Sequence, residues 1–95
     1  MPEMIFHVRW PDGTEEACYS PSLVIKEHFA EGERYALPDF LARSRTALTL
    51  ASERVREKFG FACSRAMGQL AQIEATAARF ETAPEARVAI IAFEE

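Results

Sequence analysis

Two cysteines and two histidines are the side chains of this 95-residue chain that most often carry chemistry. A zinc site needs ligands held in short-spaced pairs, and Cys18, Cys63, His7 and His28 form no such pair. Nucleophilic catalysis needs a cysteine activated by a neighbouring base. Cys18 and His7 fall on the two strands of a predicted hairpin and could approach one another, although a cysteine facing a core is commoner. We therefore expect no metal, no cofactor and no catalytic residue, and we keep Cys18 as a candidate reactive thiol.

A second candidate site is a basic stretch in the middle of the chain. Residues 41–65 carry six basic side chains against two acidic ones, whereas the chain as a whole has a net charge of −4. On an ideal helix Arg43 and Arg54 lie within about 20° of each other, as do Arg45 and Arg56. The two pairs therefore flank the apolar side of the helix. Long basic side chains often border a buried stripe with their charged ends in water, and this is the ordinary interpretation. The alternative is a binding surface for an acidic protein or a phosphorylated ligand, with Arg43 and Arg54 as the better candidates.

Composition limits the class of partner and the compartment. The negative net charge opposes binding to nucleic acid or to an anionic membrane surface. The longest apolar stretch, residues 88–93, is too short to span a bilayer. The first ten residues lack the continuous apolar stretch of an export signal. We expect a cytoplasmic protein with two free thiols and with no nucleic-acid or membrane partner.

The elements that must position these residues begin with a β-hairpin. Apolar residues alternate over residues 4–10, which is the pattern of a half-buried strand. The sequence Pro-Asp-Gly-Thr at residues 11–14 is a strong turn signal. Residues 15–19 then form the returning strand. Cys18 lies on the opposite face of that strand from Ala17 and Tyr19.

Helices follow the hairpin. Ser20 and Pro21 predict the start of a short helix over residues 21–29. Helical spacing of apolar residues predicts a long helix from residue 38 to about 59, which ends at Gly60, and a second one over residues 62–80. The residues expected to face inward are Phe40, Leu41, Ala47, Leu48, Ala51, Val55 and Phe59 on the first, and Cys63, Ala66, Met67, Leu70, Ile73, Ala77 and Phe80 on the second.

The last element is a strand that is apolar on both faces. Residues 35–37 are expected to be briefly extended, and Pro84 ends the second long helix. Residues 87–93 then form a terminal strand beside the first one, buried at the centre of the sheet or in a dimer. The predicted fold is a single α+β domain over residues 1–95, with a small, mostly antiparallel three-stranded sheet and the helices on one face. A homodimer is the expected oligomeric state.

Three long strings of residues carry a family resemblance over essentially the whole chain. They are VRWPDG at residues 8–13, CYSPS at residues 18–22 and ASERVREKFGFACSRA at residues 51–66, and the opening MPEM agrees with them. In these strings the chain resembles the small bacterial family of nitrogen-starvation response proteins. The resemblance implies a gene cluster with a nitrilase, a radical-SAM protein, an acetyltransferase and a flavoprotein, linked to the use of nitrile or cyanide nitrogen. It carries over no catalytic residue.

Two functional hypotheses follow from these observations. The first is a non-enzymatic accessory or interaction protein that acts with cluster-encoded enzymes in nitrogen starvation or nitrile utilisation. The second is a small-molecule-binding or catalytic subunit that uses Cys18 or the basic helix. A deep polar pocket at these residues would favour the second hypothesis, and a flat, partly apolar surface would favour the first.

Overall fold

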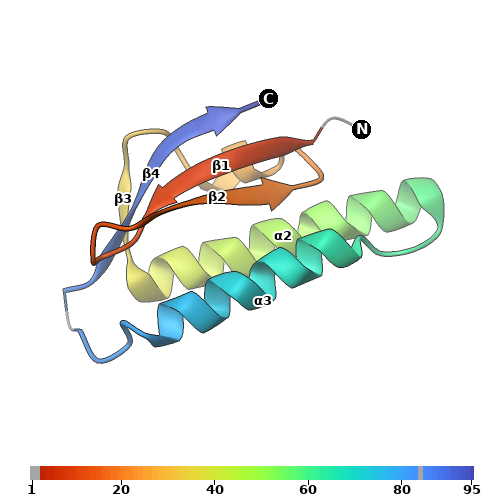
Figure 1. Cartoon of the computed structure of the whole chain (residues 1–95). Coiled ribbons are helices and arrows are strands. Elements are labelled where there is room, and N and C mark those ends of the chain that lie inside the picture. Colours follow the sequence, from red (N-terminus) through yellow and green to blue (C-terminus); the bar gives the residue numbers. More distant parts are fainter. Residues whose placement is uncertain (1–2, 84) are drawn as a thin grey trace.

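The computed structural model describes residues 3–83 and 85–95 and has the predicted α+β fold. In this part of the chain four strands and three helices follow in the order β1, β2, α1, β3, α2, α3, β4 (Figure 1). Pro84, which we expected to end the second long helix, lies outside the described residues. The bounds are Met4–Arg9 for β1, Glu15–Ser20 for β2, Ile25–His28 for α1, Arg34–Ala36 for β3, Leu37–Phe59 for α2, Ser64–Ala78 for α3 and Arg87–Glu94 for β4.

The predicted hairpin is confirmed. Strands β1 and β2 pair in antiparallel fashion, and the turn between them contains Gly13 at a φ of 90°. The carboxylate of Asp12 accepts a hydrogen bond from the backbone N–H of Thr14 at 3.0 Å, which fixes the turn. The register places Phe6 opposite Cys18 and therefore decides which face of the sheet each side chain occupies.

The terminal strand lies beside the first one, as predicted. The sheet order is β2-β1-β4-β3 and every pair is antiparallel. Strand β4 therefore has a hydrogen-bonded neighbour on both sides, and its Val88 and Ile90 are buried in the core. The sheet has four strands rather than the expected three. Residues 34–36 pair with β4, and the ladder continues through the backbone of Glu33 and Gly32 to Ile90 at 2.9 and 2.8 Å.

The short helix α1 is one turn long, and our prediction of a helix over residues 21–29 was wrong in its first half. Serine side chains hold the preceding residues in turns instead. The hydroxyl of Ser20 donates to the carbonyl of Ser22 at 2.7 Å. The hydroxyl of Ser22 accepts from the backbone N–H of Val24 at 3.3 Å. These local bonds compete with the start of a helix.

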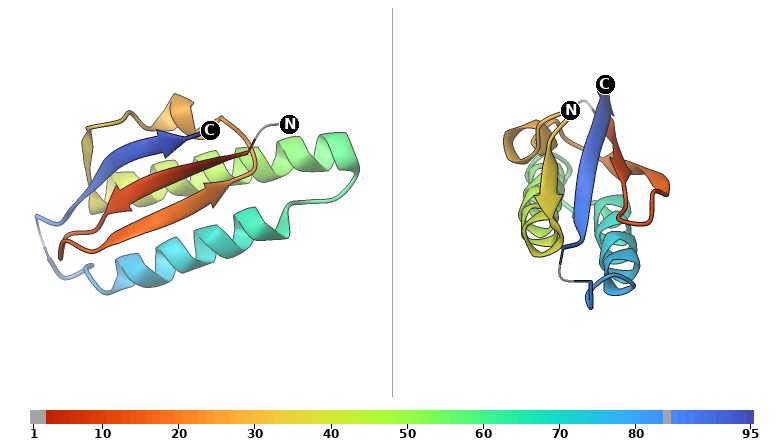
Figure 2. Two further views of the ribbon diagram at one scale, coloured as in Figure 1. Left: turned by 45° about the horizontal axis from the view of Figure 1, so that its top comes forward. Right: turned by 90° about the vertical axis from the view of Figure 1, so that its left-hand side faces the viewer.

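Helices α2 and α3 run side by side along one face of the sheet (Figure 2). Gly60 ends α2 in the left-handed conformation, with φ at 87°, as its position predicted. Helix α3 is shorter than expected at both ends. Cys63 is extended and donates its backbone N–H to the hydroxyl of Ser52 at 3.1 Å, so that the helix begins at Ser64.

The core fills the space between the helices and the inner face of the sheet. Aromatic rings form its centre: Phe40 packs edge-to-face on Trp10, with ring centroids 5.5 Å apart, and contacts Phe29 at 5.4 Å. Alternation along each strand sends every second side chain into this core and leaves the other face of the sheet without a helix in the described part of the chain.

Candidate functional site

Strand alternation places Cys18, the candidate reactive thiol, and His7, its candidate base, on opposite faces of the sheet. Cys18 faces the core opposite Phe6 and is 0% exposed. His7 pairs with Ala17 on the outer face, where its Nε2 lies 2.7 Å from a carboxylate oxygen of Glu94. Burial raises the pKa of the Cys18 thiol, and the charge of nearby Glu16 raises it further. In this geometry His7 cannot deprotonate Cys18, and the thiol has the environment of an unreactive core residue.

The basic helix is α2, and its first arginine is held by structural contacts. Arg43 donates from Nη1 to the carbonyl of His28 at 2.7 Å and from Nε to the carboxylate of Asp39 at 3.0 Å. Its guanidinium also lies 4.8 Å from the centre of the Tyr35 ring. These contacts fasten the end of α1 to α2. A ligand would have to displace them to reach Arg43.

The other three arginines of α2 lie in different surroundings. Arg54 is on the side of α1, with a carboxylate oxygen of Glu27 at 3.8 Å. Arg45 is on the side of α3, where its Nε donates to the carboxylate of Glu74 at 2.8 Å. Arg56 lines a small hollow between α2 and α3. The helix separates the four arginines, and they form no continuous basic surface.

The far end of the helical hairpin presents a different surface. Helix α2 continues beyond the sheet before the chain turns at Gly60 (Figure 1). Phe59 is 56% exposed and Phe61 is 69% exposed, and Met67 near the start of α3 is 37% exposed. Our prediction that Phe59 and Met67 face inward was therefore wrong. Phe59 lies in the last turn of α2, where the helix has passed the end of the sheet (Figure 1), so the helical period alone does not decide whether it is buried.

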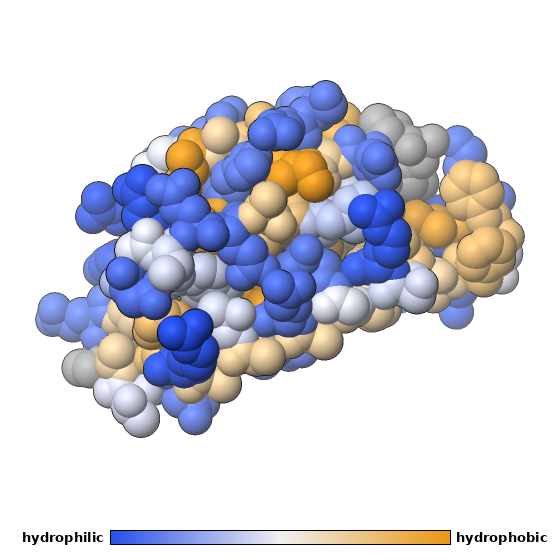
Figure 3. Space-filling view, in the orientation of Figure 1, coloured by the Kyte–Doolittle hydropathy of each residue, from blue (hydrophilic) through white to orange (hydrophobic). Residues whose placement is uncertain are grey.

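Basic side chains surround these apolar residues. Lys58 lies with its ammonium 5.9 Å from the centre of the Phe59 ring. Arg56, the acidic Glu53 and Met67 line one hollow, whose volume is about 130 Å³. In the space-filling view, apolar surface gathers at the right-hand end of the molecule, where Figure 1 places the turn between the helices (Figure 3). We call this surface the hairpin tip and define it as Arg56, Lys58, Phe59, Phe61 and Met67.

One feature of the sequence indicated exposed aromatic residues at the hairpin tip, although helical periodicity predicted that Phe59 is buried. Phe59 and Phe61 flank the glycine that ends α2. A helix that ends between two aromatic residues turns at least one of them toward solvent unless another element covers the turn. The predicted element order left no such element for this turn.

The described residues contain neither a metal-binding cluster nor a membrane-spanning helix. Across residues 3–83 and 85–95, no group of three or more histidine, cysteine, aspartate or glutamate side chains is placed to hold a metal ion. No helix in these ranges is long and apolar enough to cross a membrane.

Comparison with known proteins gives one match. A sequence profile of the family described as nitrogen starvation-induced protein NitG matches residues 5–93. The chain belongs to this family. The match to NitG confirms the resemblance seen in the sequence and extends from β1 to the end of β4. The chain has no match among curated proteins or among solved structures. Membership in the NitG family indicates when the protein is made and leaves its molecular activity open.

Proposed function

We propose that this NitG-family protein is a non-enzymatic accessory protein of the nitrogen-starvation response and binds a partner protein through the hairpin tip. The exposed aromatic pair of Phe59 and Phe61 is the observation that carries this proposal. Large exposed apolar side chains gathered at one place on a small protein usually mark an interaction surface. Aromatic residues and arginine are also enriched at the centres of protein interfaces.

The partner surface should combine an apolar hollow with acidic residues. The tip contributes Arg56 and Lys58 beside its aromatic rings. The net charge of the chain is −4, and at the tip the two basic side chains are accompanied by Glu53 and Glu57. Acidic residues of a partner would contact Arg56 and Lys58 at the edge of the aromatic surface. The enzymes encoded beside family members, a nitrilase among them, are the partners we propose.

The basic helix has less support as the main binding surface. Arg43 and Arg45 are held by contacts within the chain, and each binds a carboxylate there. The alternative of a catalytic subunit that uses Cys18 has less support for a related reason, because that thiol is enclosed in the core.

Affinity capture from nitrogen-starved cells, followed by binding to the purified partner, tests this proposal. We expect the wild-type protein to recover a cluster-encoded enzyme, and a Phe59→Ser/Phe61→Ser variant to lose it. Both rings are largely exposed, so the variant should remain folded. Binding of the purified enzyme should weaken as salt rises, because exposed charges more than about 10 Å apart are screened at 0.1 M ionic strength.

An Arg43→Gln/Arg54→Gln variant is the matched control. It changes two α2 side chains outside the hairpin tip, and it should recover the same enzyme as the wild type. Recovery of the same proteins by the tip variant and the wild type would reject the hairpin tip as the partner-binding surface. Recovery of no cluster-encoded enzyme by the wild-type protein would reject the accessory role.

A further inference from the structure

Three arginines meet on the outer face of the sheet although they are far apart in the sequence. Arg9 on β1 and Arg34 on β3 are both paired with Ala89 on β4, one on each side. Arg87 lies two residues before Ala89 on the same strand and is paired with Ala36. Neighbouring strands are about 4.8 Å apart, so that Arg9 and Arg34 start about 10 Å apart with only a methyl group between them. The register therefore places the three arginines at neighbouring positions on the outer face of the sheet, with Arg34 and Arg87 on the adjacent strands β3 and β4.

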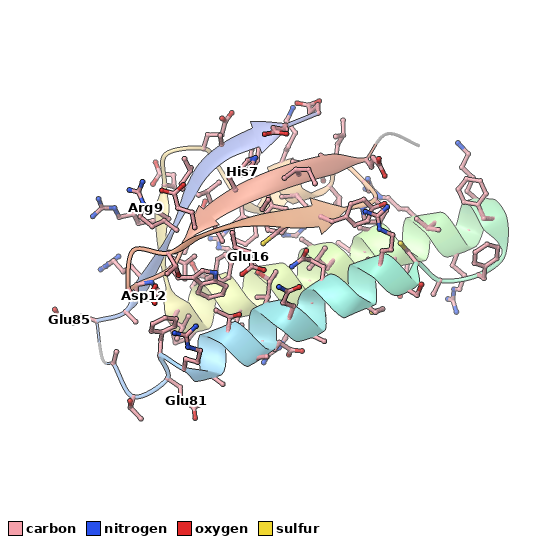
Figure 4. All side chains as sticks on the ribbon, in the orientation of Figure 1. His7, Arg9, Asp12, Glu16, Glu81 and Glu85 are labelled. Carbon is pink, nitrogen blue, oxygen red and sulfur yellow. The ribbon has the colours of Figure 1, made fainter. Side chains whose placement is uncertain are left out.

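A hollow lies at this end of the sheet. It is shallow and open to solvent, with a volume of about 640 Å³, and is lined by Arg34 and Arg87, by the carboxylate-bearing Glu85, and by three small apolar residues. Arg9 and Glu85 are seen at the end of the molecule away from the hairpin tip (Figure 4). The apolar residues of the lining are Pro11, Ala83 and Ala86.

The ion pairs of the molecule leave this hollow positively charged. Arg9 is neutralised by Glu15, with Nη2 2.9 Å from the carboxylate. Among residues 3–83 and 85–95, three arginines make no ion pair, namely Arg34, Arg56 and Arg87. Two of these three line the same hollow, against the single carboxylate of Glu85.

We propose that this hollow binds the oxyanion of a small molecule, a phosphate or carboxylate group, between Arg34 and Arg87. A planar guanidinium donates two parallel hydrogen bonds to such a group, and two of them can hold it from both sides. The apolar residues of the hollow would contact the rest of the ligand. Glu85 repels a second negative group, which favours ligands with a single anionic end. This site lies beyond the proposed partner binding and does not depend on it.

Titration followed by amide NMR spectra tests the site. The probes are inorganic phosphate and acetate, added at constant ionic strength against chloride. We expect saturable shifts at the amides of Arg34, Arg87 and Ala89 with at least one probe. Saturation by phosphate alone would identify a phosphate ligand, and saturation by acetate alone a carboxylate. Shifts that rise linearly without saturation for both probes would overturn the proposal.

Matched variants separate a built site from general charge attraction. Arg34→Gln and Arg87→Gln should each weaken binding about tenfold, which corresponds to about 1.4 kcal/mol for a lost charged hydrogen bond. Glu85→Gln should strengthen it. Arg56→Gln removes the third arginine without an ion pair, at the other end of the molecule, and should leave binding unchanged. Equal weakening by Arg56→Gln and Arg34→Gln would overturn the site, since only net charge would then matter.

Discussion

Of two buried serines on α2, one has a hydrogen-bonded hydroxyl group and the other does not. Removing these hydroxyl groups should therefore have opposite effects on the stability of the protein. Ser52 is 4% exposed, and its hydroxyl accepts the backbone N–H of Cys63 at 3.1 Å. Ser44 is 0% exposed, and its hydroxyl has no hydrogen-bond partner among the described residues. The first hydroxyl anchors the loop between the long helices. The second is a polar group taken out of water without compensation.

The expected changes in the free energy of unfolding follow from the surroundings of the two hydroxyl groups. Ser52→Ala leaves the N–H of Cys63 without its acceptor, and a buried donor left unpaired costs about 1–3 kcal/mol. Cys63 is only partly buried, so water can replace part of the lost bond, and we expect a loss near 1 kcal/mol. Ser44→Ala removes an unpaired buried hydroxyl, whose burial costs about 1–3 kcal/mol. Alanine also favours the helix. We expect this variant to gain about 0.5–1 kcal/mol, because the small cavity left behind offsets part of the benefit.

Urea unfolding followed by circular dichroism measures both variants. The two should differ by about 1.5–2 kcal/mol in the free energy of unfolding, with unchanged m values. In melting temperature, about 1 kcal/mol corresponds to about 4–8 °C for a domain of this size. Ser52→Ala should also speed hydrogen exchange at Cys63 while leaving the amides of the sheet as slow as before. Equal destabilisation by the two substitutions would refute the reasoning, because packing rather than hydrogen bonding would then decide both effects.

Two further predictions concern the thiols and the oligomeric state. Alkylation of the native protein, followed by mass spectrometry, should modify Cys63 first and Cys18 only on unfolding. Burial raises the pKa of Cys18 and blocks access to its thiol. Rapid labelling of Cys18 at pH 9 would contradict this prediction. The homodimer stays a prediction. Strand β4 already has a strand on each side within one chain, so a dimer would have to use another surface, such as the outer face of the sheet with Ala17 and Ala92. Sedimentation should show a dimer at high micromolar concentration, and a clean monomer there would reject it.

Local sequence signals predicted the elements they govern. The turn residues at 11–14 fixed the hairpin, and Gly60 fixed the end of α2, because both act through the backbone conformation of one or two residues. The apolar character of residues 88–93 predicted a central strand, and β4 has β1 on one side and β3 on the other. Each of these features can be read without knowing what lies opposite in the fold.

Features that depend on a distant neighbour could not be read in this way. The sequence predicted an extended segment over residues 35–37, and the strand lies at residues 34–36 because Leu37 already begins α2. That this segment pairs with β4 could not be predicted from its own residues. Periodicity placed Phe59 on the correct side of α2 but could not tell how far the sheet extends along it. The meeting of Arg34 with Arg87 required the register between two strands, which is set by pairing across the whole sheet.

The two proposed surfaces lie at opposite ends of a molecule that is 41 Å long and 22 Å wide. An oxyanion in the hollow therefore cannot touch a partner at the hairpin tip, and the two binding events do not compete. Direct electrostatic coupling between them is also weak, because charges separated by several Debye lengths are screened at physiological salt. Helix α2 spans the distance, beginning one residue after β3 and ending at the tip. If binding at one end changes affinity at the other, linkage requires the reverse effect of the same size, and a shift of α2 against the sheet is the structural route that this fold provides.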